Sequence, residues 1–147
     1  MVGGIRRLPD LHGVNYSEMR WIADSLGIRV SSANLPKGTN GLYRDTDQRI
    51  LLELNMTYRQ KRCALAHELM HWRRGDQTCS TCESCRQERR ARRDTALALI
   101  DPVDYATAEN VCDGDPSAIA EELEVTKQVL EDFRNMLHDG MLPPSRR

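Results

Sequence analysis

The sequence predicts an α+β fold in which a small β-sheet packs against helices. Three observations lead to this prediction. Apolar residues recur at helical spacing in several stretches, short aliphatic runs follow the first of them, and the last third of the chain again has a helical pattern. Because 147 residues is the length of one domain, we expect residues 1–147 to form a single domain, with a core over about 15–105 and a C-terminal helical segment over about 117–139.

The N-terminal part is expected to hold one helix and the sheet. The helix spans residues 15–27, because Asn15 and Glu18 have the spacing of a capping box in front of an apolar-periodic stretch. Aliphatic or β-branched runs then predict strands, the last two as a hairpin or as neighbours: residues 28–35, 41–44 and 49–55.

The remainder of the chain is expected to be helical. Thr57 and Gln60 form a second capping-box pattern, and Gly75 is a suitable end for the helix that follows it. The other segments are a polar, cysteine-bearing loop over 76–84, a helix over 86–100, a linker or short helix over 103–116, and two helices over 117–140 that break near 124–126.

Composition and charge exclude several classes of protein. With 39% hydrophobic and 29% charged residues, the chain has the balance of a soluble globular protein, and a formal net charge of −1 gives no global attraction to nucleic acids or anionic lipids. No segment resembles a signal peptide or approaches the roughly 20 apolar residues of a membrane span. We therefore expect a cytoplasmic protein that does not bind membranes, and whose five cysteines stay reduced.

The stretch LAHELMHW, residues 65–72, carries the strongest functional pattern. Positions four apart lie on one face of a helix, so His67 and His71 can bind one metal ion. Glu68 points beside that ion, where its carboxylate can accept a proton from an activated water molecule. This H-E-x-x-H spacing predicts a Zn²⁺ site with Glu68 as general base. The alternative is an ordinary helix whose two histidines share a face by chance.

A catalytic zinc site needs a third protein ligand. Glu88 is the best candidate, because it begins a face of small or apolar residues on the next predicted helix and lies far enough from His71 for the chain to turn back. Asp94 is the fallback ligand, and Glu83 is less favoured because we expect it in the loop.

These residues make the chain resemble the ImmA/IrrE family of zinc metallopeptidases. The resemblance lies in the segments GIRV, LPKGTNGLY, RILLELN, RQKRCALAHELMHW and QERRARRDTALALIDP, which together run from about residue 26 to 102. It implies a zincin-like metallopeptidase fold in which His67, His71 and Glu88 bind Zn²⁺ and Glu68 is the catalytic base. In relatives an acidic or Asn residue commonly stands near Arg92 and a large apolar residue near Asp94.

The resemblance also implies a class of substrate. Family members act on helix-turn-helix transcriptional repressors, often in phages and mobile elements, and cleavage relieves repression. The expected activity is therefore site-specific cleavage of such a repressor by a zinc endopeptidase, in the bacterial host cytoplasm if the gene is carried by a phage.

The hydrolysis of a peptide bond also needs a donor for the oxyanion and a surface for the substrate. Tyr43 and Tyr58 are candidate donors, although a tyrosine near a strand is more often part of the core. Residues 49–55 are a candidate sheet edge that could pair with an extended substrate, or else an ordinary half-buried strand.

Two other clusters suggest different chemistry. Cys79, Cys82 and Cys85 have spacing found in structural zinc sites, but four ligands are usual, so loop thiols are the simpler interpretation; Cys63 is most simply a core residue. The run RQERRARR could bind phosphates, although an exposed helix face is the more common role of such a run.

The C-terminal segment has the pattern of a helix-turn-helix, but its charge argues against DNA binding. Residues 117–139 contain six acidic and two basic side chains, so their net charge of −4 would repel phosphates. Two alternatives to the peptidase remain: a catalytically silent regulator that binds a repressor or DNA with the same fold, and a structural zinc protein built on the cysteine loop.

Overall fold

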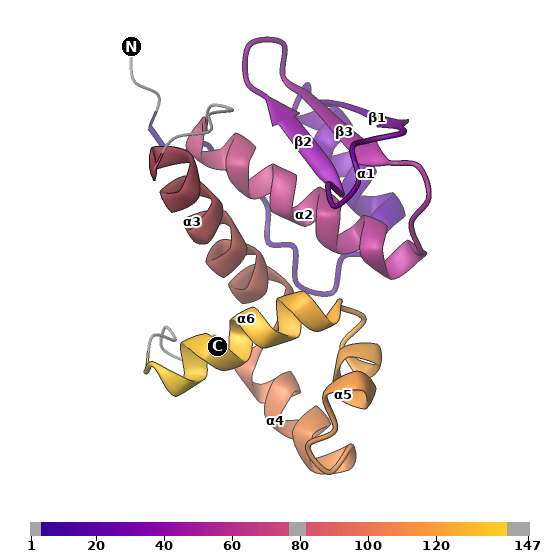
Figure 1. Ribbon diagram of the computed structural model, residues 1–147, viewed down its shortest axis with the longest axis vertical. Helices are drawn as coiled ribbons and strands as arrows, with labels where there is room; N and C mark the ends of the chain where they lie inside the picture. Colours follow the sequence, from indigo (N-terminus) through magenta and orange to yellow (C-terminus); the bar gives the residue numbers. More distant parts are fainter. Residues whose placement is uncertain (1–3, 77–81, 141–147) are drawn as a thin grey trace.

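The computed structural model describes residues 4–76 and 82–140, and for residues 82–85 it describes the backbone alone. Within these residues the fold is α+β, with a three-stranded sheet and six helices (Figure 1). α2 lies between the sheet and α3, and the last three helices gather at the end of the molecule away from the sheet (Figure 1).

The sheet is formed by β1 (Arg29–Ala33), β2 (Gly41–Arg44) and β3 (Arg49–Glu53) in the order β1-β3-β2. β1 is parallel to β3, and β2 is antiparallel to β3, which confirms that the last two strands are neighbours. Of the two alternatives for residues 49–55, the sheet edge is wrong, because β3 is the central strand, and the half-buried strand is confirmed. Ile50 and Leu52 are fully buried on it, as is usual for a strand paired on both sides.

Two helices begin and end where the local signals place them. α1 (Tyr16–Ser25) has both hydrogen bonds of the capping box between Asn15 and Glu18. α2 (Tyr58–Arg74) has the same arrangement at Thr57 and Gln60, and Gly75 ends it in the left-handed conformation at φ 65°. An N-cap of this kind contributes about 1 kcal/mol to stability.

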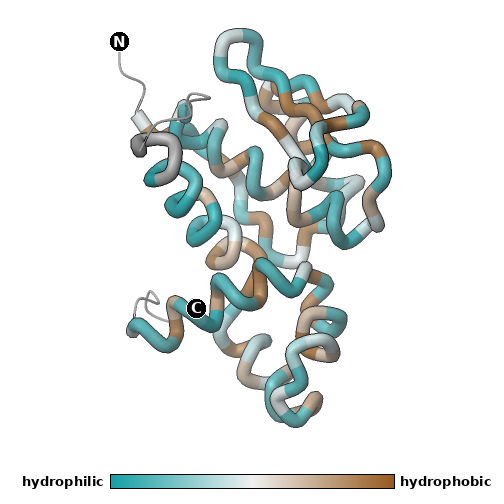
Figure 2. The backbone as a smooth tube through the Cα atoms, viewed as in Figure 1, coloured by the Kyte–Doolittle hydropathy of each residue, from teal (hydrophilic) through white to brown (hydrophobic). Residues whose placement is uncertain are grey.

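α3 (Cys82–Leu99) begins four residues earlier than the sequence predicts. Figure 2 shows that it is hydrophilic along its arginine-rich part and hydrophobic toward its C-terminal end, where it meets the core. Glu83, expected in a loop, is therefore helical in backbone, and its side chain lies outside the described residues.

The C-terminal part consists of α4 (Pro102–Val111), α5 (Pro116–Glu122) and α6 (Lys127–His138). The break between α5 and α6 lies where the sequence predicts it, with Glu124 at φ 55°. Residues 103–111 are a short helix rather than a linker. Ile119, Val125 and Phe133 are fully buried and join these helices to the rest of the core.

Candidate metal centre and catalytic cleft

Two histidines of α2 and one glutamate of α3 converge at the centre of the molecule. The rings of His67 and His71 lie edge to face with centroids 4.9 Å apart. Glu88 Oε2 lies 3.0 Å from His67 Nε2, and Glu88 Oε1 lies 3.1 Å from His71 Nε2. One potential ligand atom from each residue lies within 4.8 Å of the others. Two imidazole nitrogens and a carboxylate oxygen form a donor set that suits Zn²⁺.

The charges of this cluster depend strongly on one another. Hydrogen bonds from His67 and His71 hold the pKa of Glu88 far below its usual range, although partial burial opposes the shift. Burial lowers the pKa of His71, but the hydrogen bonds to Glu88 and Asp76 and the charge of Glu68 outweigh it and raise the pKa to about 9. Protons therefore compete with a cation for the His71 nitrogen.

Glu68 lies beside the cluster with only 6% of its surface exposed. Burial raises the pKa of its carboxyl, while the neighbouring His67 and His71 work in the opposite direction. A carboxylate with a raised pKa is a better proton acceptor near neutral pH. Its position suits the role of a base rather than that of a third ligand.

Gly41 of β2 makes room for the Glu68 side chain. A Cβ atom at residue 41 would lie 2.9 Å from Glu68 Oε2 and 3.0 Å from Glu68 Cγ, closer than side chains can pack. The strand can therefore approach the active-site helix only because this residue has no side chain.

Asp76 is a site residue that the sequence analysis missed. Its Oδ2 atom lies 2.9 Å from His71 Nδ1, and only 5% of its side chain is exposed. Arg90 of α3 lies on its other side, with Nη2 3.6 Å from Oδ1. Such a carboxylate fixes the tautomer and the ring orientation of a metal-binding histidine. The available signal was an acidic residue directly after the Gly75 cap.

The fallback ligand Asp94 lies elsewhere. Its carboxylate accepts a hydrogen bond of 2.8 Å from Arg74 Nε on α2, so it joins the two helices and does not face the histidines. Arg92 pairs with Asp132 on α6 through Nε at 3.1 Å and Nη2 at 2.7 Å. Both positions at which the chain departs from the ImmA/IrrE pattern are thus matched by an opposite charge on a neighbouring helix.

The cluster opens into a cleft of about 530 Å³. One face of α2 forms its floor, and β2, α3 and the first half of α6 form its walls. β2 pairs with β3 on one side, and its other side borders the cleft, since residues 38–43 line it. The sheet edge next to the candidate metal centre is therefore β2.

The two candidate oxyanion donors are engaged elsewhere. The hydroxyl of Tyr43 donates to Asp45 Oδ1 at 2.5 Å and accepts from Arg6, and burial together with the Asp45 hydrogen bond raises the pKa of the phenol. Tyr58 is not among the residues that line the cleft, and its hydroxyl accepts from the backbone nitrogen of Ser17 at 3.3 Å. Tyr43 lines the cleft, but its hydroxyl is already hydrogen-bonded to Asp45 and Arg6, and Tyr58 lies outside the cleft lining.

The cysteine cluster falls largely outside the described residues. Cys79 is not described, and only the backbone is described at Cys82 and Cys85, so the alternative zinc site is untested. Cys63 is buried, its pKa is raised by burial, and its sulfur accepts from the backbone nitrogen of Thr126 at 3.4 Å. It packs as the core residue that the sequence suggests.

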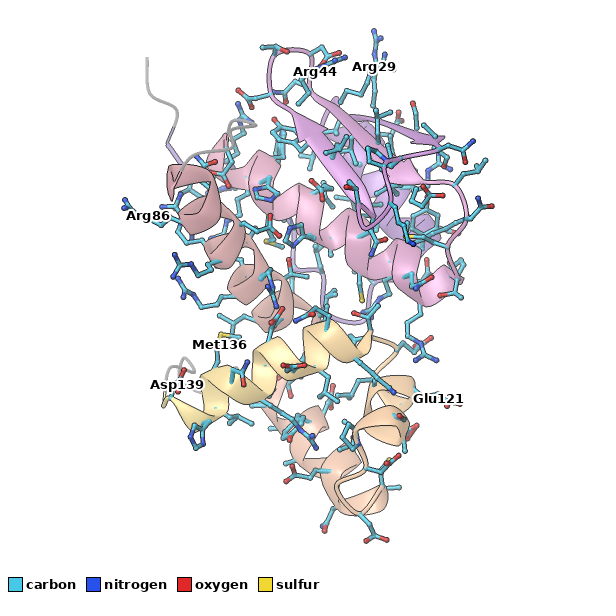
Figure 3. All side chains as sticks on the ribbon, in the orientation of Figure 1. Arg29, Arg44, Arg86, Glu121, Met136 and Asp139 are labelled. Carbon is cyan, nitrogen blue, oxygen red and sulfur yellow. The ribbon has the colours of Figure 1, made fainter. Side chains whose placement is uncertain are left out.

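Charged side chains outside the cleft are distributed over different elements. In Figure 3, Arg86 projects from the start of α3, whereas Glu121 projects from α5 at the opposite edge of the view. Among the described residues, no helix combines the length and the apolar character that a membrane span requires.

Comparison with known proteins assigns the chain to a family. Residues 23–133 match the family model Peptidase_M78, described as an IrrE N-terminal-like domain. No curated protein and no solved structure gives a significant match. The matched segment includes both histidines, Glu68 and Glu88, and it covers more than half of the chain. The chain therefore belongs to the peptidase M78 family of IrrE N-terminal-like domains.

Proposed function

We propose that this chain is a zinc-dependent endopeptidase that cleaves a helix-turn-helix transcriptional repressor of a phage or mobile element. One observation carries the proposal: Glu88 converges with His67 and His71, while Glu68 lies buried beside them. This is the donor set and the base that a peptidase of this type needs.

His67, His71 and Glu88 would hold the metal, and Asp76 would orient His71. When bound, Zn²⁺ supplies Lewis acidity, which polarises a peptide carbonyl and makes a water molecule a stronger nucleophile. Glu68 would take the proton of the attacking water at its carboxylate and later deliver it to the leaving amine nitrogen. Its burial supports this role, because a raised pKa favours proton uptake near neutral pH.

The substrate would bind as an extended segment along β2. This strand has one side paired with β3 and the other beside the cleft, so its backbone can pair with a peptide. The walls formed by α3 and α6 leave a restricted cleft, which supports selective cleavage rather than general digestion. The repressor as substrate rests on the family resemblance and on no residue of this site.

The test compares zinc content and peptide cleavage in three variants. Glu88→Gln should lose about one equivalent of zinc, because a catalytic site loses its metal with its third ligand. Asp94→Asn is the matched control on the same helix and should keep its zinc, since Asp94 pairs with Arg74. Glu68→Gln should keep zinc and abolish cleavage of a helix-turn-helix repressor from the same genome.

The results distinguish the three functions that the sequence allows: a zinc peptidase, a catalytically silent regulator and a structural zinc protein. If Glu68→Gln retains full biological effect, the protein is a regulator that works without turnover. If Glu88→Gln retains zinc while Cys82→Ser loses it, the metal belongs to the cysteine cluster. Either result would reject the proposed peptidase.

A further inference from the structure

Arg92 of α3 lines the cleft close to the candidate metal centre. It is four residues after Glu88, so the two side chains share one face of α3, and the charge of Glu88 acts on the guanidinium. Among the described residues that line the cleft, Arg92 is the only lysine or arginine. The permanent positive charge of the cleft wall therefore lies one helical turn from the candidate metal centre.

The guanidinium of Arg92 is held in a fixed orientation. Asp132 of α6 accepts from its Nε and Nη2 atoms, and Gln128 donates to the same carboxylate at 3.1 Å. Asp132 is largely buried, with 12% of its side chain exposed, while 40% of the Arg92 side chain remains accessible. An arginine ordered in this way loses less conformational entropy when it binds a ligand.

The arrangement leaves one edge of the guanidinium open. Asp132 takes the edge formed by Nε and Nη2, and Nη1 donates no hydrogen bond to residues 4–76 or 86–140. The Nη1 and Nη2 edge is a second fork with two parallel N–H groups. A carboxylate is the ligand that matches such a fork with two hydrogen bonds.

We propose that the cleft selects peptide substrates with an aspartate or glutamate side chain near the cleaved bond, bound by Arg92 of α3 while Asp132 of α6 holds the guanidinium in place. This inference rests on the proposed peptidase function and adds the substrate preference of the same cleft. Because Asp132 offsets part of the charge of Arg92, we expect kcat/KM to be about tenfold higher for a peptide with Glu than for the same peptide with Gln. This factor lies near the lower end of what a charge-assisted hydrogen bond contributes.

A different result is expected if the ion pair between Arg92 and Asp132 is purely structural. If Arg92 and Asp132 only join α3 to α6, Arg92→Gln and Asp132→Asn should have similar effects on cleavage. If Arg92 binds the substrate, the two variants change the preference for acidic substrates in opposite directions. Arg92→Gln removes the acidic preference, whereas Asp132→Asn keeps a hydrogen-bond acceptor for Arg92, removes the competing charge and raises the preference above that of the wild type.

The experiment uses full-length, zinc-loaded protein and a peptide library prepared from a denatured bacterial proteome, with cleaved bonds identified by mass spectrometry. A synthetic peptide pair with Glu or Gln at the enriched position then gives kcat/KM for the wild type and each variant. Arg89→Gln, an exposed arginine on the same helix that does not line the cleft, is the matched control. Circular dichroism confirms that each variant is folded.

Enrichment of Asp or Glu at one position, lost in Arg92→Gln, strengthened in Asp132→Asn and unchanged in Arg89→Gln, would support the inference. Cleavage without acidic enrichment, or equal effects of the two variants, would overturn it and leave the proposed peptidase intact. Absence of any cleavage by the wild-type protein would reject the proposed function and the inference with it.

Discussion

At the scale of single residues, the site depends on residues that neighbour the histidines and Glu68 without being part of the H-E-x-x-H pattern. Asp76 fixes the orientation of His71 from beyond the end of α2, and Gly41 leaves space for Glu68 from a strand. Asp76 acts locally, from just past the Gly75 cap, whereas Gly41 acts across the fold from a strand that precedes α2. The H-E-x-x-H pattern thus specifies the chemistry of the site, while residues outside the pattern specify the geometry of the site.

The space at Gly41 gives a prediction for activity. Gly41→Ala should lower kcat/KM by about tenfold or more, because the added Cβ forces the Glu68 carboxylate out of position, and displacements near 1 Å are costly in an active site. Zinc content should be unchanged, since the three atoms nearest to the added Cβ all belong to Glu68, which is not a candidate ligand. Gly4→Ala is the control, because a Cβ there meets nothing within 4 Å. Full activity of Gly41→Ala, measured on the same peptide, would contradict the prediction.

At the scale of helices and strands, the sequence predicts what local signals determine. The capping residues Asn15 and Thr57 and the terminator Gly75 act within one turn of their own helix, and each lies where it was expected. The position of β3 in the sheet depends on pairing with segments far along the chain, so one strand's pattern could not show that it is central. For the same reason Gly41 was missed, since it meets Glu68 only when β2 packs against α2. Asp76, in contrast, is a local contact of His71, and its signal was an acidic residue directly after the Gly75 cap.

The pairing of α2 with α3 gives a second prediction. A double-mutant cycle with Arg74→Gln and Asp94→Asn should show a coupling free energy of about 1 kcal/mol, because this ion pair is largely shielded from solvent. The exposed pair Arg44 and Asp47 serves as control, and its cycle should show no measurable coupling. Urea unfolding of the four variants of each cycle gives the values. Equal coupling in the two cycles would mean that burial of the first pair contributes nothing.

At the scale of the whole molecule, the candidate cleft is formed by segments that lie far apart in the sequence. Its floor and sheet edge come from the part before residue 76, whereas one wall comes from α6 near the C-terminus. The shape of the cleft therefore depends on the packing of α6 against α3 and on the contacts that join the C-terminal segment to α2. One buried polar contact with α2 is made by Arg62, which is 7% exposed.

Arg62 gives the third prediction, for global stability. Its Nε donates to the carbonyl of Val14 before α1, and its Nη1 donates to the carbonyl of Glu124 between α5 and α6, both at 2.8 Å. Arg62→Met fills a similar volume but leaves both carbonyls without this donor, so the free energy of unfolding should fall by about 3 kcal/mol in urea titrations. Arg29→Met is the control, since Arg29 projects into solvent at the edge of the sheet (Figure 3). A loss no larger than that of the control would show that water replaces the arginine at both carbonyls.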